Sequence, residues 1–359
     1  MKLIIILGTR PEIIKMSPVI RACENEGLDY FILHTGQHYS YNMDKVFFEQ
    51  LELPMPKYNM NIGSGTHGEQ TGKMLAGIED VLIKEKPDVV LVEGDTNTVL
   101  AGALAATKLN IKVGHVEAGL RSYDRSMPEE TNRILTDHCS DFLFAPTEKS
   151  KQILLSEGIS DKKIFVTGNT VVDAVYQNLR IGGEKVNPLK EHELIPKEYF
   201  LATAHRQENV DDKDRFGGII NGLELIANEF DLPVIYPIHP RAKKMIGTFG
   251  LKTNAIKFIE PLDYLSFLQI EAKAKMVLTD SGGVQEESCI LNVPCVTLRF
   301  NTERPETIES GLNQLAGSDS KNILDVTKQM MCSTKSNYEN PFGDGSAGIK
   351  IINILTERG

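Results

Sequence analysis

The chain of 359 residues has few cysteines and no cluster of basic residues. Its cysteines are odd in number and lack the paired spacing of a zinc site; they are Cys23, Cys139, Cys289, Cys295 and Cys332. We therefore expect these cysteines to be buried thiols of a protein in a reducing compartment, and we expect no metal site formed by them. A formal net charge of −10 without any run of Lys and Arg argues against nucleic acid as a partner.

The sequence also lacks a long hydrophobic run at its start and a dinucleotide-binding glycine motif. The apolar residues 1–7 are followed by Gly8-Thr9-Arg10-Pro11-Glu12, which ends the run far short of a membrane span. No small-residue cleavage site follows, so the segment predicts the first β-strand of a cytoplasmic protein with no membrane partner. Because Gly8-Thr9-Arg10 does not match Gly-x-Gly-x-x-Gly, a nicotinamide cofactor has no binding loop, and no cofactor is expected.

Short apolar runs alternate with helical patterns along the whole chain, which predicts parallel sheets with helices on both faces. At about 150 residues per domain, the length favours two domains. The predicted strands are residues 2–7, 30–34, 88–92, 112–116, 141–145, 163–166, 199–204, 233–238, 256–259, 275–279 and 293–298. Residues 181–197 are rich in Gly, Pro and charge without periodicity, and we expect the linker there or slightly before.

The most informative segment is the turn after the predicted strand 275–279. It reads Asp280-Ser281-Gly282-Gly283 and leads directly into a helix, whose N–H groups and positive dipole end favour an anion such as phosphate. Ser-Gly-Gly alone would also make an ordinary tight connection. Arg304 follows just after the next strand, and an arginine beside a helix N-terminus is a phosphate ligand.

Carboxylates follow the strands of the first half, where parallel sheets bind ligands. Asp95 is a candidate catalytic residue or the N-cap of a helix over residues 96–108. Glu117 is a candidate base or a structural partner of Arg121. Glu130 opens a helix, where the dipole favours an acidic residue whatever its function.

Four further polar residues have a functional and a structural interpretation. His205 and His239 end strands of the second half, where either could be a structural histidine. Arg10 and Lys15 could be surface charges on the first helix, although a cation at the helix start is unfavourable unless an anion binds there.

Together these motifs resemble the UDP-N-acetylglucosamine 2-epimerases, closest to the non-hydrolysing type. The matching segments are residues 8–15, 93–96, 115–121, 128–133, 205–206, 280–287 and 303–306. The resemblance implies an α/β fold of the GT-B type, with two doubly wound Rossmann-like domains facing a cleft. It implies an N-terminal domain of residues 1–169 completed by the C-terminal helix within 346–359, and a UDP-binding domain of residues 170–345. It further implies a homodimer, with UDP-N-acetylglucosamine, UDP-N-acetylmannosamine and UDP as ligands.

The resemblance also implies roles for single residues. The diphosphate and ribose would be held by Ser281, Gly282, Gly283 and Glu287, with His239, Arg304 and Arg10 also binding the nucleotide. The sugar and leaving group would be surrounded by Lys15, Asp95, Glu117, Glu130 and His205. Gln207 and the segment 37–40 depart from the pattern of bacterial relatives, at positions that serve an activating second sugar-nucleotide site there.

Chemistry explains the need for several carboxylates. The hydrogen on carbon 2 is not acidic, whereas breaking the bond from carbon 1 to UDP first gives an oxocarbenium-like species that a base can deprotonate to 2-acetamidoglucal. Asp95, Glu117 and Glu130 are the candidate acids and bases, without assignment to faces of the sugar. A hydrolysing epimerase, a GT-B glycosyltransferase and a non-catalytic sugar-nucleotide sensor are the alternatives.

Overall fold

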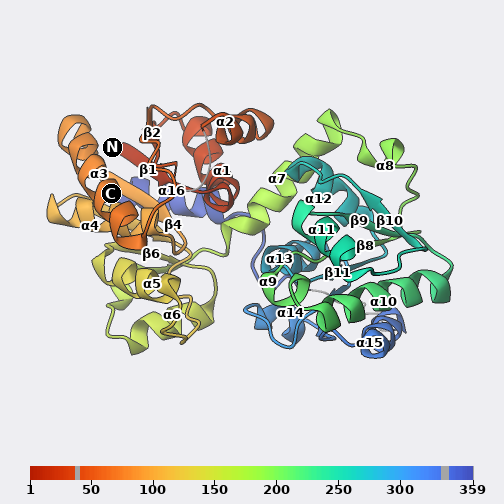
Figure 1. Cartoon of the computed structure of the whole chain (residues 1–359). Coiled ribbons are helices and arrows are strands. Elements are labelled where there is room, and N and C mark those ends of the chain that lie inside the picture. The colour runs from red at the N-terminus through yellow and green to blue at the C-terminus, as the bar shows by residue number, and fades with distance from the viewer. Residues whose placement is uncertain (37–40, 333–338, 359) are drawn as a thin grey trace. The chain divides into compact units, whose positions relative to one another are not determined.

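The computed structural model describes residues 1–36, 41–332 and 339–358. The chain folds into two compact units, one formed by Met1–Gln177 with Phe342–Gly359 and the other by Asn178–Pro341. Each unit contains one parallel sheet with helices packed against it (Figure 1). The segment 37–40, where we expect a departure from bacterial relatives, lies outside the described residues.

The sheet of the first unit reverses its strand order between β1 and β4. In spatial order its parallel strands are β3 (Tyr58–Asn59), β2 (Asp29–His34), β1 (Lys2–Leu7), β4 (Val89–Glu93), β5 (Lys112–Val116), β6 (Phe142–Ala145) and β7 (Ile164–Val166). β1 pairs with both β2 and β4, with Leu3 opposite Tyr30 on one side and Val89 on the other. The reversal makes the carboxyl ends of β1 and β4 a topological switch point, which is the usual place of a ligand site in such sheets.

The sheet of the second unit has the same arrangement, with the reversal between β8 and β11. Its parallel strands are, in spatial order, β10 (Ile256–Ile259), β9 (Val234–Pro237), β8 (Phe200–Thr203), β11 (Met276–Thr279), β12 (Cys295–Thr297) and β13 (Asn313–Leu315). Two doubly wound Rossmann-like units in one chain confirm the predicted fold class of the GT-B type.

The helices surround these sheets. In the first unit and across its boundary they are α1 (Arg10–Asn25), α2 (Tyr41–Gln50), α3 (His67–Glu85), α4 (Asn97–Lys108), α5 (Pro128–Cys139), α6 (Glu148–Ser156), the 3₁₀ turn η1 (Asp161–Lys163), α7 (Thr170–Lys185) and α16 (Ala347–Arg358). In the second unit they are α8 (Pro188–Glu191), α9 (Gln207–Val210), α10 (Lys213–Phe230), α11 (Pro240–Phe249), α12 (Tyr264–Lys273), α13 (Gly282–Ile290), α14 (Pro305–Glu309) and α15 (Ser320–Cys332).

The last helix, α16, packs in the first unit beside α1 (Figure 1). Gly348 allows this contact, because a Cβ there would lie 3.0 Å from atoms of Pro18. The carboxylate of Asp173 accepts hydrogen bonds from the N–H groups of Ala347 and Gly348, at 3.2 and 2.9 Å, and so caps α16.

The chain passes between the units inside α7, since the boundary falls between Gln177 and Asn178. An irregular linker is therefore the wrong expectation for residues 181–185, which form the last turns of this helix. Gly182 and Gly183, which suggested a loop, belong to the helix. At Gly182 a Cβ would lie 2.8 Å from the side chain of Gln269, so the glycine permits close packing on α12.

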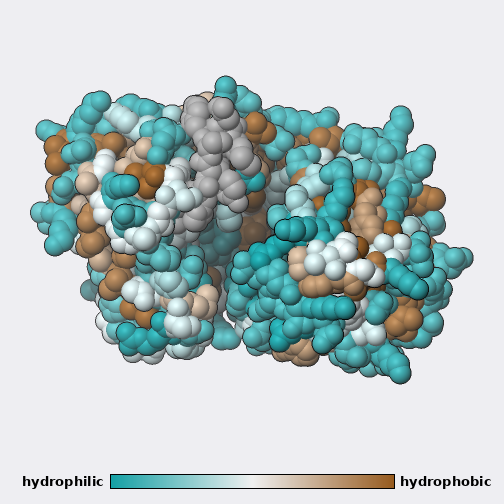
Figure 2. All heavy atoms as spheres, viewed as in Figure 1, coloured by the Kyte–Doolittle hydropathy of each residue, from teal (hydrophilic) through white to brown (hydrophobic). Residues whose placement is uncertain are grey.

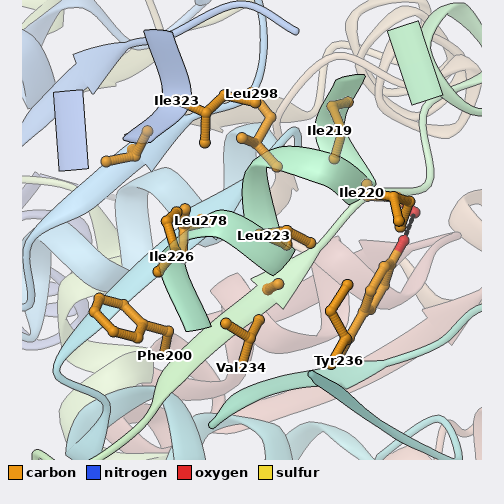
Figure 3. Packing of buried hydrophobic residues seen from close by; sticks show 14 of the residues in the cluster. Phe200, Ile219, Ile220, Leu223, Ile226, Val234, Tyr236, Leu278, Leu298 and Ile323 are labelled. Carbon is orange, nitrogen blue, oxygen red and sulfur yellow. Dashed lines mark hydrogen bonds between the residues drawn. The ribbon is translucent and has the colours of Figure 1, made fainter. Parts of the chain in front are cut away.

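Large aliphatic and aromatic side chains form the core of the second unit (Figure 3). Phe200 and Val234 from the sheet meet Leu223 and Ile226 from α10, and all four side chains are fully buried. Tyr236 is buried in the same cluster and donates a hydrogen bond of 2.5 Å to the carbonyl of Ala204, which satisfies its hydroxyl. This packing holds β8 and β9 against α10.

The visible surface of each unit is mixed in character. On the face shown in Figure 2, hydrophobic residues of each unit are scattered in small groups among hydrophilic ones. Among the helices that the structure describes, none has the length and apolar character needed to cross a membrane.

Candidate active site

Charged residues of the first unit gather where β1, β4 and β5 end. Residues 8–12 follow β1, residues 93–95 end and follow β4, and Glu117 follows β5. β1 and β4 flank the switch point, and β5 is the next strand along. The sequence therefore places its polar motifs where a ligand of this fold is expected.

Lys15 on α1 joins two buried carboxyl groups. Its Nζ lies 2.7 Å from both carboxylate oxygens of Glu117 and 3.2 Å from Oε1 of Glu93. Glu117 Oε1 also accepts a hydrogen bond of 2.9 Å from Asn169 Nδ2. Only 16% of the Lys15 side chain is exposed, so the interpretation of Lys15 as a surface charge is wrong.

Glu117 has a backbone conformation that is unusual for its residue type. Its φ is 69°, in the left-handed region, which costs a residue other than glycine about 1–3 kcal/mol and is typical of functional sites. Arg121 is not its partner: the guanidinium lies 2.7 Å from Asp137 and 2.6 Å from Glu157. The interpretation of Glu117 as a structural partner of Arg121 is therefore wrong. Glu117 is a buried carboxylate with a strained backbone.

His115 precedes Glu117 and belongs to a network that fixes the strand ends. Its Nδ1 lies 2.6 Å from Asp137 Oδ1, and its Nε2 lies 2.8 Å from the carbonyl oxygen of Gly94. Burial alone would raise the pKa of Asp137, but His115 and Arg121 outweigh burial and hold this pKa below its usual value. Both ring nitrogens are therefore engaged in structural contacts.

Glu12 is a buried carboxyl at the start of α1 that the sequence interpretation did not single out. It accepts hydrogen bonds from Gly8 N at 2.5 Å, Thr9 N at 3.3 Å and Thr96 Oγ1 at 2.6 Å. Burial raises its pKa to about 7, against the opposing effect of these donors. The sequence does indicate a capping box, because Glu12 is the third residue of the helix that follows Thr9. It does not indicate the burial of Glu12 beside Thr96, which depends on tertiary structure.

Asp95 and Glu130 are connected through Arg133. Arg133 Nη2 lies 2.5 Å from Asp95 Oδ2, and Nη1 lies 3.1 Å from Glu130 Oε2. The N-cap of α4 is Thr96, so the alternative interpretation of Asp95 as a helix cap is wrong. The Asp95 side chain is 30% exposed, which leaves it accessible to a ligand.

Glu130 holds the loop that precedes its own helix. Its carboxylate accepts hydrogen bonds from Ser122 N at 2.8 Å, Ser122 Oγ at 2.9 Å and Tyr123 N at 3.0 Å. Burial would raise the pKa of Glu130, but the donors from Ser122, Tyr123 and Arg133 lower it below its usual value. These contacts suit an ionised, structural carboxylate, and a catalytic role stays a prediction.

Arg10 occupies the first position of α1, where its side chain packs against an aromatic ring. The guanidinium lies 5.2 Å from the centroid of Phe47. Such stacking keeps the charge while restricting the side chain. It therefore compensates in part for the unfavourable position of a cation at a helix start.

In the second unit, Asp280 ties the end of β11 to the end of β8. Its carboxylate accepts hydrogen bonds from His205 N and Arg206 N, each at 3.0 Å, and from Asn209 Nδ2 at 3.1 Å. Burial would raise the pKa of Asp280, but His205 and the other donors lower it below its usual value. His205 Nδ1 lies 3.1 Å from Asp280 Oδ1, and its side chain is 48% exposed. The ionised Asp280 thus orients a histidine that solvent can reach.

The N-terminus of α13 lies next to this pair. Ser281 is the N-cap, and no side chain caps the helix within the part of the chain that the structure describes. A Cβ on Gly282 or Gly283 would meet no atom closer than 3.9 Å, so the backbone there is open to a ligand. This geometry can bind an anion.

The remaining predicted nucleotide residues have partners of their own. Arg304 Nε lies 2.8 Å from Glu286 Oε1. Burial raises the pKa of Glu287 to about 7, opposed by a hydrogen bond from Tyr264. His239 caps α11, since its Nδ1 accepts a hydrogen bond of 3.3 Å from Arg241 N, which is a structural contact.

No group of three or more metal-binding side chains lies within the ranges 1–36, 41–332 and 339–358. The polar cluster of the first unit contains carboxyl groups, Lys15 and Arg133. Such a cluster can exchange protons and bind a polar ligand.

The chain is similar to known sugar-nucleotide epimerases. The family described as UDP-N-acetylglucosamine 2-epimerase matches residues 21–356. The UDP-N-acetylglucosamine 2-epimerase of Methanocaldococcus jannaschii is 61% identical over 363 residues, covering 99% of both chains. The crystal structure of the Methanocaldococcus jannaschii enzyme in complex with UDP-GlcNAc and UDP superposes with a TM-score of 0.86 at 59% identity, covering 99% of this chain and 100% of that chain.

A relative with another substrate is more distant. The UDP-2,3-diacetamido-2,3-dideoxy-D-glucuronate 2-epimerase of Pseudomonas aeruginosa is 42% identical over 364 residues, covering 99% of this chain and 100% of that protein. The resemblance found in the motifs is confirmed along nearly the whole chain: it belongs to the UDP-N-acetylglucosamine 2-epimerase family.

Proposed function

We propose that the protein catalyses the reversible epimerisation of UDP-N-acetylglucosamine to UDP-N-acetylmannosamine at carbon 2. The observation that supports this most strongly is the buried contact of Lys15 with Glu117 and Glu93, in a chain of this family. A strained carboxylate beside a lysine is suited to proton transfer on a bound sugar. The greater identity to the Methanocaldococcus jannaschii enzyme favours this substrate over the diacetamido glucuronate.

The proposed route is elimination and re-addition. The bond between carbon 1 and the UDP oxygen breaks and its electron pair leaves with UDP. A base then takes the proton from carbon 2, which leaves 2-acetamidoglucal. Return of a proton to the opposite face of carbon 2 and attack of UDP on carbon 1 give the epimer, and no redox cofactor is needed.

We assign the sugar chemistry to the first unit. Asp95 and Glu117 are the proposed acid and base, and Lys15 fixes the Glu117 carboxylate. Glu130 holds Arg133 against Asp95, so its proposed contribution acts through Asp95. Removing a general acid or base of this kind typically costs a hundredfold or more in rate.

Nucleotide recognition is assigned to the second unit. The N–H groups at Ser281, Gly282 and Gly283 would bind the diphosphate, aided by Arg304. Glu287 would accept hydrogen bonds from the ribose. His205, held by Asp280, would stabilise the departing UDP, with His239 as a further predicted ligand. Arg10 of the first unit is also a predicted ligand of the nucleotide.

The product decides between this proposal and a hydrolysing epimerase. NMR of a reaction with UDP-N-acetylglucosamine should show a nucleotide-linked manno sugar, whereas free N-acetylmannosamine with UDP would indicate hydrolysis.

In deuterated water, substrate and product should both gain deuterium at carbon 2, because the intermediate exposes that proton to exchange. Retention of the original hydrogen through many turnovers would exclude the elimination route.

Light scattering in solution tests the proposed homodimer, which a monomeric mass would contradict.

A further inference from the structure

Glu93 is a buried carboxyl group at the candidate site that the proposed mechanism does not yet use. It is the last residue of β4 and lies opposite Val116, the residue before Glu117, in the pairing of β4 with β5. Val90 and Val92 belong to the core under α3 and α4. Because side chains alternate along a strand, Glu93 faces the other side of the sheet, where it meets Lys15 of α1.

The charges around Glu93 do not balance if every group is ionised. Within the described part of the chain, Lys15 is the cation whose ion pairs reach Glu93 and Glu117, and Glu12 is a further carboxyl group near Glu93. Two other titratable groups at this end of the sheet have partners of their own: Asp95 pairs with Arg133, and His115 contacts Asp137 and Gly94. A single lysine shared by two buried carboxyl groups offsets one negative charge, which favours a proton on the other carboxyl group.

The hydrogen bonds indicate which carboxyl group is ionised. Both oxygens of Glu117 accept hydrogen bonds of 2.7 Å from the Lys15 ammonium, and Oε1 also accepts a hydrogen bond from Asn169 Nδ2. Glu93 Oε1 lies 3.2 Å from the same ammonium but in a direction that makes no hydrogen bond. Donors that converge on Glu117 stabilise its charged form, while Glu93 has no comparable set.

We propose that Glu93 is a positioning residue for Glu117, which keeps its proton at neutral pH and donates it in a hydrogen bond to the Glu117 carboxylate. The proposal rests on the proposed function only in taking Glu117 as an acid or base. Burial raises the pKa of Glu93 well above its usual value, Lys15 opposes this, and Glu117 raises it further. The protonated Glu93 and the charged Lys15 together hold one carboxylate in one orientation.

This arrangement has a consequence at high pH. When Glu93 loses its proton, it no longer donates to Glu117, and its new charge competes for Lys15. The orientation of Glu117 is then lost, and turnover falls along an alkaline limb of the pH profile. A merely structural Glu93 would change stability without creating such a limb.

Two substitutions separate these roles. Glu93→Gln keeps a donor of the same shape without a titrating proton, whereas Glu93→Leu removes the donor. We expect Glu93→Leu to lower kcat at least about tenfold relative to Glu93→Gln with little difference in KM, since the loss concerns a group acting in the chemical step. The alkaline limb of wild type should be absent from the Glu93→Gln profile. The control is Glu79→Gln, an exposed carboxylate on α3, which should keep the wild-type profile.

Infrared difference spectra test the proton directly, without substrate. Wild type minus Glu93→Gln at neutral pH should contain the carbonyl stretch of a protonated carboxylic acid, and this band should disappear as the pH is raised. Absence of the band, or an alkaline limb that persists in Glu93→Gln, overturns the proposal. The infrared result stands even if Glu93→Leu does not fold or if the enzyme proves to act on another sugar nucleotide.

Discussion

Lys15 Nζ lies 2.7 Å from each carboxylate oxygen of Glu117, although the two residues are 102 positions apart in sequence. The contact connects α1 with the end of β5 across the switch point of the sheet. Such a pair is costly to break, because removing one partner leaves the other charge buried. It therefore links the stability of the first unit to the geometry of its proposed catalytic carboxylate.

Lys15→Met should reduce both stability and turnover. The substitution keeps the length of the side chain but removes the ammonium that contacts both oxygens of Glu117, and breaking a buried pair typically costs about 3–5 kcal/mol. We expect a loss of at least about a hundredfold in kcat, because an acid or base that is no longer held in place loses its contribution to the rate. Thermal unfolding and initial rates measure the two effects.

Lys45→Met is the matched control for this prediction. Lys45 forms an exposed pair with Glu49 one helical turn away. Exposed pairs of this kind contribute about 0–1 kcal/mol, so stability and activity should both stay near wild type. Equal effects of the two substitutions would mean that the contact with Glu117 has no special importance.

Substitution of the candidate acids and bases should separate direct from indirect roles. Asp95→Asn and Glu117→Gln should each lose at least about a hundredfold in turnover with the fold intact. Glu130→Gln should also lose about a hundredfold, but through Arg133, because its carboxylate holds that guanidinium.

A double-mutant cycle distinguishes the indirect route. If Glu130 acts by way of Arg133, the variant carrying both Glu130→Gln and Arg133→Met should be hardly slower than Arg133→Met alone. Fully additive losses would instead indicate that Glu130 contacts the substrate itself. Circular dichroism checks that each variant is folded.

The sequence was most predictive where local pattern decides structure. The bounds of β1, β5 and β10 agree with the predicted strands, because their apolar runs are bounded by clear turn or polar signals. β3 and β13 were missed, since they have only two and three residues and contain Asn59 and Asn313. Strands this short are defined by their neighbours rather than by their own residues.

Long-range contacts explain what the sequence could not supply at the site. Glu93 and Glu12 look like ordinary acidic residues until folding buries one beside Lys15 and the other beside Thr96, 84 positions away. Asp95 was recognised by its position after a strand, but its partner Arg133 comes from α5. Burial and pairing, which determine the chemistry of a carboxyl group, are properties of the assembled sheet.

Arg304 should be important for nucleotide affinity. Its guanidinium is paired with Glu286, and the proposed phosphate would become a second anion for it. A hydrogen bond to a charged group contributes about 1.5–3 kcal/mol, so Arg304→Met should weaken UDP binding roughly tenfold to a hundredfold. Calorimetric titration with UDP at two salt concentrations measures the change. Arg241→Met, which removes a partly exposed arginine of the same unit that pairs with Asp211, is the control, and an equal effect of both variants would exclude a phosphate contact.

The buried carboxyl of Glu12 should make stability depend on pH. Its pKa is raised by burial from 4.5 to about 7, so the folded state keeps a proton that the unfolded state releases. This contribution to stability is complete below the unfolded pKa and is lost as the pH rises through about 7. Between pH 5 and pH 8 the difference in unfolding free energy between wild type and Glu12→Gln should fall by about 2–3 kcal/mol.

Urea unfolding at pH 5 and pH 8 measures the Glu12 effect, and Glu85→Gln provides a contrast of opposite sign. Lys2, Lys57 and Tyr58 lower the pKa of Glu85 to about 2, so its contribution is present above the usual carboxyl range and is lost only as the pH falls toward that value. Between pH 5 and pH 8 the Glu85→Gln difference should therefore stay constant while the Glu12→Gln difference changes. A Glu12→Gln difference that is equally flat would mean that Glu12 is ionised in the folded protein, with its three donors outweighing its burial.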